Sequence, residues 1–257
     1  MSYLKCKLCG KQYPENEMSE EHYPAKSVGN NDIVKLNLMK VFDSLNNEEF
    51  LKTIEKRIKN GESIHEVAGE YFDNEIAESA FPLGRTARTL CRECNTFLGR
   101  YDEAYLKFYL NEGNPSVIKG FQKKTRVYII KSILGKFLSI PEAQEEVFDF
   151  LDYLRDDERE KYEGSWHLYF VKRNINSDLM GMMDISTGKL SYEQGVVYEL
   201  SDEKFIFNLM NFEKHSCYEM TDFFDILKAN YTITDGTGPG GEYHAQLLMS
   251  RWFRELL

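Results

Sequence analysis

The chain has 257 residues, of which 42% are apolar and 14% aromatic, a composition that supports one large or two small globular domains. It contains no apolar run of the roughly 18 to 20 residues that a membrane helix requires, and a cysteine at position 6 argues against a secretory leader. We therefore expect a cytoplasmic protein with no membrane partner. The formal net charge of −10 weakly disfavours nucleic acid as a partner, although the distribution of charge matters more than its sum.

The first thirty residues predict one half of a compact site. Short alternating segments at 3–5 and 11–13 surround the pair Cys6-Lys-Leu-Cys9, a pattern typical of a β-hairpin whose turn holds a metal, and a further strand is expected to end near His22. Beyond it, apolar residues spaced by three and four predict helix from about Asp32 to Ile58 and a second helix from Ile64 through Phe81.

A second cysteine pair, Cys91-Arg-Glu-Cys94, precedes the remaining predicted elements. The patterns predict helices over 95–110, 125–138 and 141–159, and a linker over 156–165. The last hundred residues are β-rich at 166–171, 179–185, 195–200 and 204–209, with a short turn at 186–189, which predicts an antiparallel sheet. The glycine-rich segment 235–241 lacks the Lys-Ser/Thr of a phosphate loop and is expected to be a flexible loop.

Basic residues are concentrated in one part of the chain. Eleven Lys or Arg and only four acids lie between Gly84 and Lys136, which leaves that segment at +7 and the remainder at −17. A basic stretch that begins at the second cysteine pair is consistent with a surface that follows phosphates. A solvated helix face is the alternative explanation for about half of these charges.

The two cysteine pairs predict a metal site. Thiols stay reduced in the cytoplasm, so four cysteines in two C-x-x-C pairs are expected to bind metal rather than form disulfides, and four thiolates at this spacing can close a tetrahedral zinc site. The 81 residues between Cys9 and Cys91 are tolerated if they fold as an insertion, because loop closure becomes only slowly more costly with length. Cys217 stands alone and is expected to be a small packing residue.

Three segments together carry a resemblance. Glu21-His22-Tyr23-Pro24 follows the first cysteine pair, and Asn95 directly follows the second. The segments CKLCGK, SEEHYPAKSVGN and TLCRECNTFLGRYD resemble the zinc-stapled, four-cysteine branch of the HNH endonucleases, also called ββα-metal or His-Me finger nucleases. The match covers roughly 3–30 and 86–112 and is specific in the order and type of its residues.

The resemblance implies a role for each matched residue. His22 would be the general base that takes a proton from water, while Glu21 and Asn95 would hold Mg²⁺ or Mn²⁺ through hard oxygen ligands. The family often has Asp where this chain has Glu21. The zinc at the four cysteines would be structural, tying the hairpin to the helix. The middle Asn of the HNH name stays open among Asn30, Asn31 and Asn37.

Two arginines flank the start of the predicted helix after Cys94. Arg92 and Arg100 could clamp phosphates, because a helix N-terminus favours anions and a guanidinium adds bidentate donors. Asn95 and Asp102 are seven residues apart and should share a helical face, where Asp102 could touch the metal or form a salt bridge.

These observations predict an α+β protein. We expect an HNH nuclease module at 1–115 with a helical insertion at about 31–84, a helical connector at 116–160 and a C-terminal α+β region at 161–257. The expected function is metal-dependent hydrolysis of phosphodiester bonds in nucleic acid, favouring DNA over RNA, in a restriction or phage-defence role. The expected partners are nucleic acid and a second copy of the chain or a defence-system protein. The alternative is a catalytically inactive zinc module that binds nucleic acid or protein; a third hypothesis is a toxin-like nuclease that acts on RNA.

Overall fold

The computed structural model describes residues 2–31, 33–36, 40, 43, 46–71, 74–75, 77–173, 187–214 and 219–236. The chain divides into two compact units: one combines Met1–Asn30 with Arg85–Leu257, and the other is Asn31–Gly84. The second unit spans the residues that the sequence assigned to an insertion. The fold is a mixture of short hairpins, helices and a sheet, which confirms the predicted α+β class. Among the described helices, none has both the length and the apolar character needed to cross a bilayer.

The first unit begins with the predicted hairpin and strand. Strands β1 (Tyr3–Lys5) and β2 (Gln12–Pro14) pair antiparallel around the first cysteine pair, and β3 (Met18–His22) ends at His22 as expected. Strand β3 pairs antiparallel with β6 (Thr86–Cys91), which continues directly into helix α4 (Arg92–Leu110). A strand near the N-terminus therefore joins a strand and helix that lie more than sixty residues later to form one ββα unit. Short 3-10 turns at Glu15–Glu17 and Lys26–Val28 precede and follow β3.

Two helices form the centre of the first unit. In α4, residues spaced by three and four, such as Leu98, Tyr101, Tyr105 and Phe108, are buried. In α5 (Lys123–Phe137), every residue from Ile129 to Phe137 is buried, so this helix is covered on all sides and its polar residues must find partners inside the protein. The two helices approach closely because Gly135 has no side chain: a Cβ there would lie 3.3 Å from Cδ1 of Leu98.

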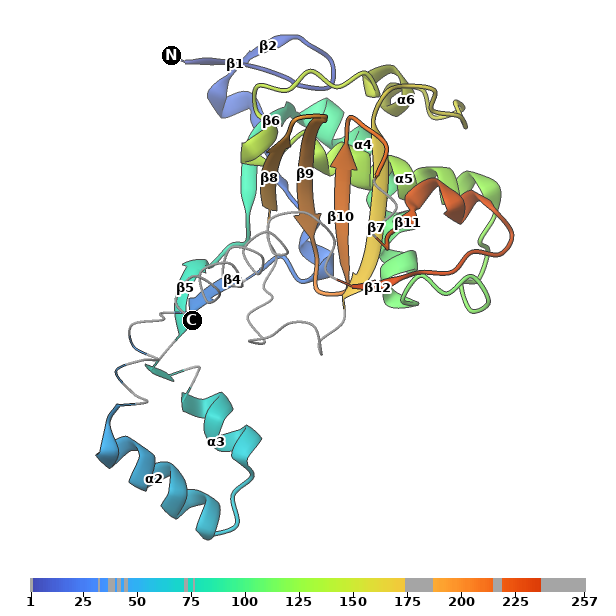
Figure 1. Ribbon diagram of the computed structural model, residues 1–257. Coiled ribbons are helices and arrows are strands. Elements are labelled where there is room, and N and C mark those ends of the chain that lie inside the picture. Colours follow the sequence, from blue (N-terminus) through green and yellow to red (C-terminus); the bar gives the residue numbers. More distant parts are fainter. Residues whose placement is uncertain are drawn as a thin grey trace. The chain divides into compact units, whose positions relative to one another are not determined.

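The C-terminal residues form the predicted antiparallel sheet. Its strand order is β11-β7-β10-β9-β8, and β12 adds to β7 in parallel. Figure 1 shows α4 and α5 behind this sheet. Phe170 and Phe205 pack against Phe108 of α4, with ring centroids 6.2 and 5.2 Å apart, so the sheet and the helices share one hydrophobic core. The strands are β7 (His167–Arg173), β8 (Thr187–Tyr192), β9 (Gly195–Ser201), β10 (Phe205–Met210), β11 (Thr221–Asp222) and β12 (Asp235–Gly236).

The described residues of the second unit include two helices and a strand pair. Helices α2 (Glu48–Lys59) and α3 (Ile64–Tyr71) confirm part of the predicted helical pattern. The prediction is wrong at both ends, where β4 (Ile33–Leu36) and β5 (Ala77–Phe81) pair antiparallel. Each of these short segments is stabilised by the other, a long-range contact that local apolar spacing does not reveal. The predicted helical residues 37–39, 41–42 and 44–45 lie outside the described part of the chain.

Two further predictions in the first unit are wrong. The helix expected over 141–159 is replaced by a 3-10 turn at Pro141–Ala143, an irregular stretch and a short helix α6 (Leu151–Arg155). Phe148 and Phe150 are both buried, and residues two apart cannot occupy the same face of an α-helix. The turn expected at 186–189 is strand β8 from Thr187 onward, because the chain reverses at Glu193 and Gln194 instead. The strand expected at 179–185 lies outside the described residues, as does most of the loop expected at 235–241.

Candidate metal centre and active site

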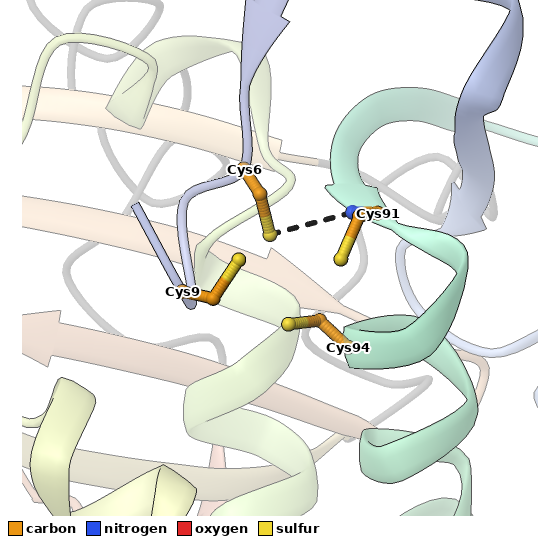
Figure 2. A group of neighbouring side chains, drawn as sticks. All are labelled: Cys6, Cys9, Cys91 and Cys94. Atoms are coloured by element: carbon orange, nitrogen blue, oxygen red, sulfur yellow. Dashed lines mark hydrogen bonds between the residues drawn. The ribbon is translucent and has the colours of Figure 1, made fainter. Parts of the chain in front are cut away.

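The four cysteines of the two C-x-x-C pairs converge. Cys6 and Cys9 come from the turn between β1 and β2, and Cys91 and Cys94 come from the end of β6 and the first turn of α4. Their Sγ atoms all lie within 4.8 Å of one another, and Figure 2 shows them pointing inward. Four thiolates at the usual Zn–S distance stand about 3.8 Å apart in a tetrahedron. The cluster therefore fits a structural metal such as zinc.

Backbone hydrogen bonds shape the first cysteine pair for this role. The amide of Cys6 donates to the carbonyl of Lys11 at 2.8 Å, and the amide of Gly10 donates to the carbonyl of Cys6 at 2.8 Å, with Gly10 at a positive φ of 75°. The amide of Cys91 donates to Sγ of Cys6 at 3.3 Å. The hydrogen bond from Cys91 favours the thiolate form of Cys6, although burial raises the pKa of this thiol, and the two bonds within the turn fix its conformation.

The rest of the first unit holds the cysteine turn in place from outside. Lys7 donates its ammonium to the carbonyl of Ala143 at 2.6 Å, and its own amide donates to the carbonyl of Thr89 on β6 at 2.9 Å. Arg155 on α6 donates Nε to the carbonyl of Leu8 at 2.7 Å. The residues that the sequence assigned to a helical connector thus contact the cysteine turn directly.

The predicted catalytic residues lie on adjoining parts of the ββα unit. His22 ends β3 opposite Thr86, and Glu21 stands opposite Ala87. Asn95 lies in the first turn of α4, which contacts β3, and its Nδ2 donates to Oγ of Ser19 on that strand at 2.6 Å. The hydrogen bond holds the amide against the strand that carries Glu21 and His22.

Glu21 belongs to a buried ion-pair network that the sequence did not predict. It is 5% exposed, and its Oε1 accepts a hydrogen bond from the ammonium of Lys136, which is 4% exposed. Lys136 also contacts Oδ2 of Asp102 at 2.7 Å, and Ser132 donates to Oδ1 of the same carboxylate at 2.7 Å. Asp102 therefore forms a salt bridge with Lys136, and its contact with a metal stays a prediction.

Burial and charge act in opposite directions on this network. Burial raises the pKa of the Glu21 carboxyl, and the ammonium of Lys136 opposes that shift. For Lys136, burial alone would lower the pKa, but the two carboxylates outweigh it and the pKa is raised. The ammonium therefore stabilises both carboxylates, whereas the two carboxylates repel one another and burial outweighs the effect of Lys136 on Glu21.

Asn30 joins the two ends of the inserted unit. Its side chain is fully buried, and Nδ2 donates to the carbonyls of Pro24 at 2.7 Å and Arg85 at 3.0 Å, while Oδ1 accepts from the amide of Arg85 at 2.6 Å. The loop that follows His22 is thereby fastened to the start of β6. Of the three candidates for the middle Asn, Asn31 is exposed and Asn37 lies outside the described residues.

Most of the basic residues between Gly84 and Lys136 are engaged within the protein. Lys131 and Lys136 are buried, and Arg126 donates to the carbonyls of Ile226 and Lys228. The sequence count therefore overstates the basic surface. Four others pair with acids: Arg88 with Glu20, Arg100 with Asp157, Lys123 with Glu160 and Lys124 with Glu158.

The two arginines expected to clamp phosphates are exposed near the start of α4. Only Arg92 lies in the first turn of α4, because Arg100 is about two turns further along the helix. Arg92 donates to the carbonyl of Asn16 at 3.4 Å. Arg100 lies over the ring of Phe97 at 4.4 Å and 3.7 Å from Asp157. Exposed contacts of this kind contribute little stability.

No family model, curated protein or solved structure matches this chain. The assignment of the candidate site therefore depends on the geometry of its residues. Sequence reasoning missed Lys136 and Ser132, although a signal was present: both interrupt the apolar run Val127–Phe137, where a polar residue without a partner would be costly.

Proposed function

We propose that this chain is a metal-dependent endonuclease of the HNH type, which hydrolyses phosphodiester bonds in nucleic acid. The observation that carries the proposal is the ββα unit. A four-cysteine cluster suited to structural zinc joins the β1–β2 turn to the junction of its second strand, β6, and its helix, α4. His22 and Glu21 lie at the end of the first strand, and Asn95 lies at the start of the helix.

The donor set supports a hard divalent ion such as Mg²⁺ or Mn²⁺ beside the zinc. Asn95 uses Nδ2 toward Ser19, which leaves its carbonyl oxygen Oδ1 for a metal. Glu21 uses Oε1 toward Lys136, which leaves Oε2. One amide oxygen and one carboxylate oxygen are ligands that Mg²⁺ accepts, with water and phosphate completing the shell. The ion, when bound, polarises the scissile phosphate and stabilises the departing oxygen.

The chain's own residues supply the remaining chemistry. His22 in its neutral form takes a proton from the attacking water, a task that suits the ordinary pKa range of imidazole. Asn30 fastens the loop that follows His22 and so limits movement of the base. Arg92 and Arg100 are proposed to contact the phosphates of the substrate, for which we favour DNA over RNA. A restriction or phage-defence role, with a second copy or a defence protein as partner, is consistent with this chemistry.

A nicking assay on supercoiled plasmid tests the proposal. Zinc-loaded wild-type protein is expected to cleave with Mg²⁺ or Mn²⁺ and to stop with EDTA. His22→Ala should abolish cleavage, whereas the control His167→Ala, on β7 of the sheet, should leave it unchanged. Failure of well-folded wild type to cleave plasmid or RNA with either ion, or full activity of His22→Ala, would contradict the proposal.

One observation favours the alternative of an inactive zinc module. Glu21 is 5% exposed and already neutralised by Lys136, which weakens it as a ligand for a solvent-derived ion. A binding module needs only the zinc, whereas the nuclease needs a second, exchangeable ion. Equilibrium dialysis with Mn²⁺ separates the two: zinc-loaded protein that binds no Mn²⁺ but binds DNA would support the module.

A further inference from the structure

The ammonium of Lys136 lies between two carboxylates that belong to different elements. Its Nζ donates to Oε1 of Glu21 on β3 and to Oδ2 of Asp102 on α4, the latter at 2.7 Å. The lysine is 4% exposed and Glu21 is 5% exposed. A lysine is buried this deeply only when its charge is paired. One side chain of α5 therefore connects β3 to α4.

Asp102 is oriented by the same helix. Ser132 lies four residues before Lys136 and so occupies the same face of α5, and its Oγ donates to Oδ1 of Asp102 at 2.7 Å. Both oxygens of Asp102 thus accept hydrogen bonds from α5. The two hydrogen bonds orient the aspartate, which in turn holds the lysine in place. The order of contacts, Ser132 to Asp102 to Lys136 to Glu21, ends at the proposed metal ligand.

The net charge of the Glu21–Lys136–Asp102 network favours the binding of a cation. Two carboxylates and one ammonium sum to a formal charge of −1, and Lys136 engages only one oxygen of Glu21. We propose that Lys136 is a positioning residue of the nuclease site, which fixes the Glu21 carboxylate through one oxygen and leaves the other for the divalent ion. This inference rests on the proposed function.

Mn²⁺ binding to zinc-loaded protein, measured by electron paramagnetic resonance without nucleic acid, tests the inference. Lys136→Met is expected to weaken Mn²⁺ binding about 10- to 100-fold, the usual effect of losing a group that orients a metal ligand. The Mg²⁺ concentration for half-maximal nicking should rise with it. A purely structural role would lower thermal stability and leave the affinity for Mn²⁺ unchanged at temperatures where the variant is folded.

Lys131→Met is the matched control. Lys131 is also fully buried on α5, but its Nζ donates to the carbonyl of Asp156 at 2.5 Å and lies 4.6 Å from the ring centroid of Tyr153. Its loss should cost stability, with Mn²⁺ affinity within about twofold of wild type. Ser132→Ala removes only the hydroxyl that orients Asp102, and it should weaken Mn²⁺ binding in the same direction by less.

The outcomes separate this inference from the proposed function. The positioning role alone would be overturned if wild type binds Mn²⁺ and cleaves while Lys136→Met binds Mn²⁺ as tightly as wild type or more tightly. Wild type that neither binds Mn²⁺ nor cleaves would overturn both. If Lys136→Met does not fold, Ser132→Ala decides: unchanged Mn²⁺ affinity in that variant would refute the inference.

Discussion

Asp202 should make the protein less stable as the pH rises toward neutrality. Its side chain lies in the turn between β9 and β10, fully buried, where Oδ1 accepts from the amides of Lys204 and Phe205 at 2.8 Å each and Oδ2 accepts from the hydroxyl of Tyr105 on α4. Burial raises the pKa of this carboxyl from 3.8 to about 6, although the hydrogen bonds oppose the shift. The charged form is therefore less stable in the folded protein than in the unfolded chain.

The sign and size of this change in the free energy of unfolding follow from the difference in the Asp202 pKa between the folded and unfolded states. Below pH 3.8 the carboxyl is protonated in both the folded and the unfolded state. Between pH 4 and 6 the unfolded chain loses the proton first, so the free energy of unfolding falls as the pH rises. Above the pKa of the folded state this free energy levels off. Asp202→Asn removes this loss and can keep all three hydrogen bonds, because the Tyr105 hydroxyl can accept from the new amide. At about 1.36 kcal/mol per pKa unit, the variant should gain about 1.5 kcal/mol at pH 5 and about 3 kcal/mol at pH 7.5.

Urea unfolding of zinc-loaded protein at the two pH values measures this difference. Asp149→Asn provides a control of opposite sign: burial opposes the shift, but hydrogen bonds from Ser165 and Tyr162 lower the pKa of Asp149. That variant should lose more stability at high pH than at low pH. An Asp202→Asn advantage that does not grow with pH, or a less stable variant at pH 7.5, would refute the reasoning.

Two further predictions concern the candidate site. Cys94→Ser should lower the zinc content from one ion per chain, because the cluster loses one of its four thiolates. Zinc is measured by inductively coupled plasma mass spectrometry. The control Cys217→Ser should leave the zinc content unchanged, and equal zinc in both variants would count against the cluster. Asn30→Ala should cost about 3 kcal/mol in chemical denaturation, since buried backbone groups at Pro24 and Arg85 lose their partner. The control Asn230→Ala, at an exposed position, should cost almost nothing, and matching midpoints for the two variants would contradict this role.

Local sequence patterns were sufficient to predict the elements whose formation depends on residues within the same segment. The hairpin around Cys6, the strand that ends at His22 and the helix that begins after Cys91 follow from alternation, turn residues and apolar spacing within each segment. Cysteine spacing predicted the four-cysteine cluster because two C-x-x-C pairs have the spacing typical of zinc ligands. The same local patterns failed at Ile33–Leu36 and Ala77–Phe81, whose strands exist through pairing with each other.

The sequence by itself determined the α+β class and the four cysteines of the candidate metal site, because residue type and spacing carry that information. The residues proposed for catalysis came from the resemblance. The tertiary structure alone decided which polar groups meet. Nothing local to Glu21 indicates that Lys136, 115 positions away, would take one of its oxygens, or that Asp102 would hold that lysine rather than a metal. Such contacts depend on how α4, α5 and β3 pack, and burial gives them their strength because a charge removed from water must be paired.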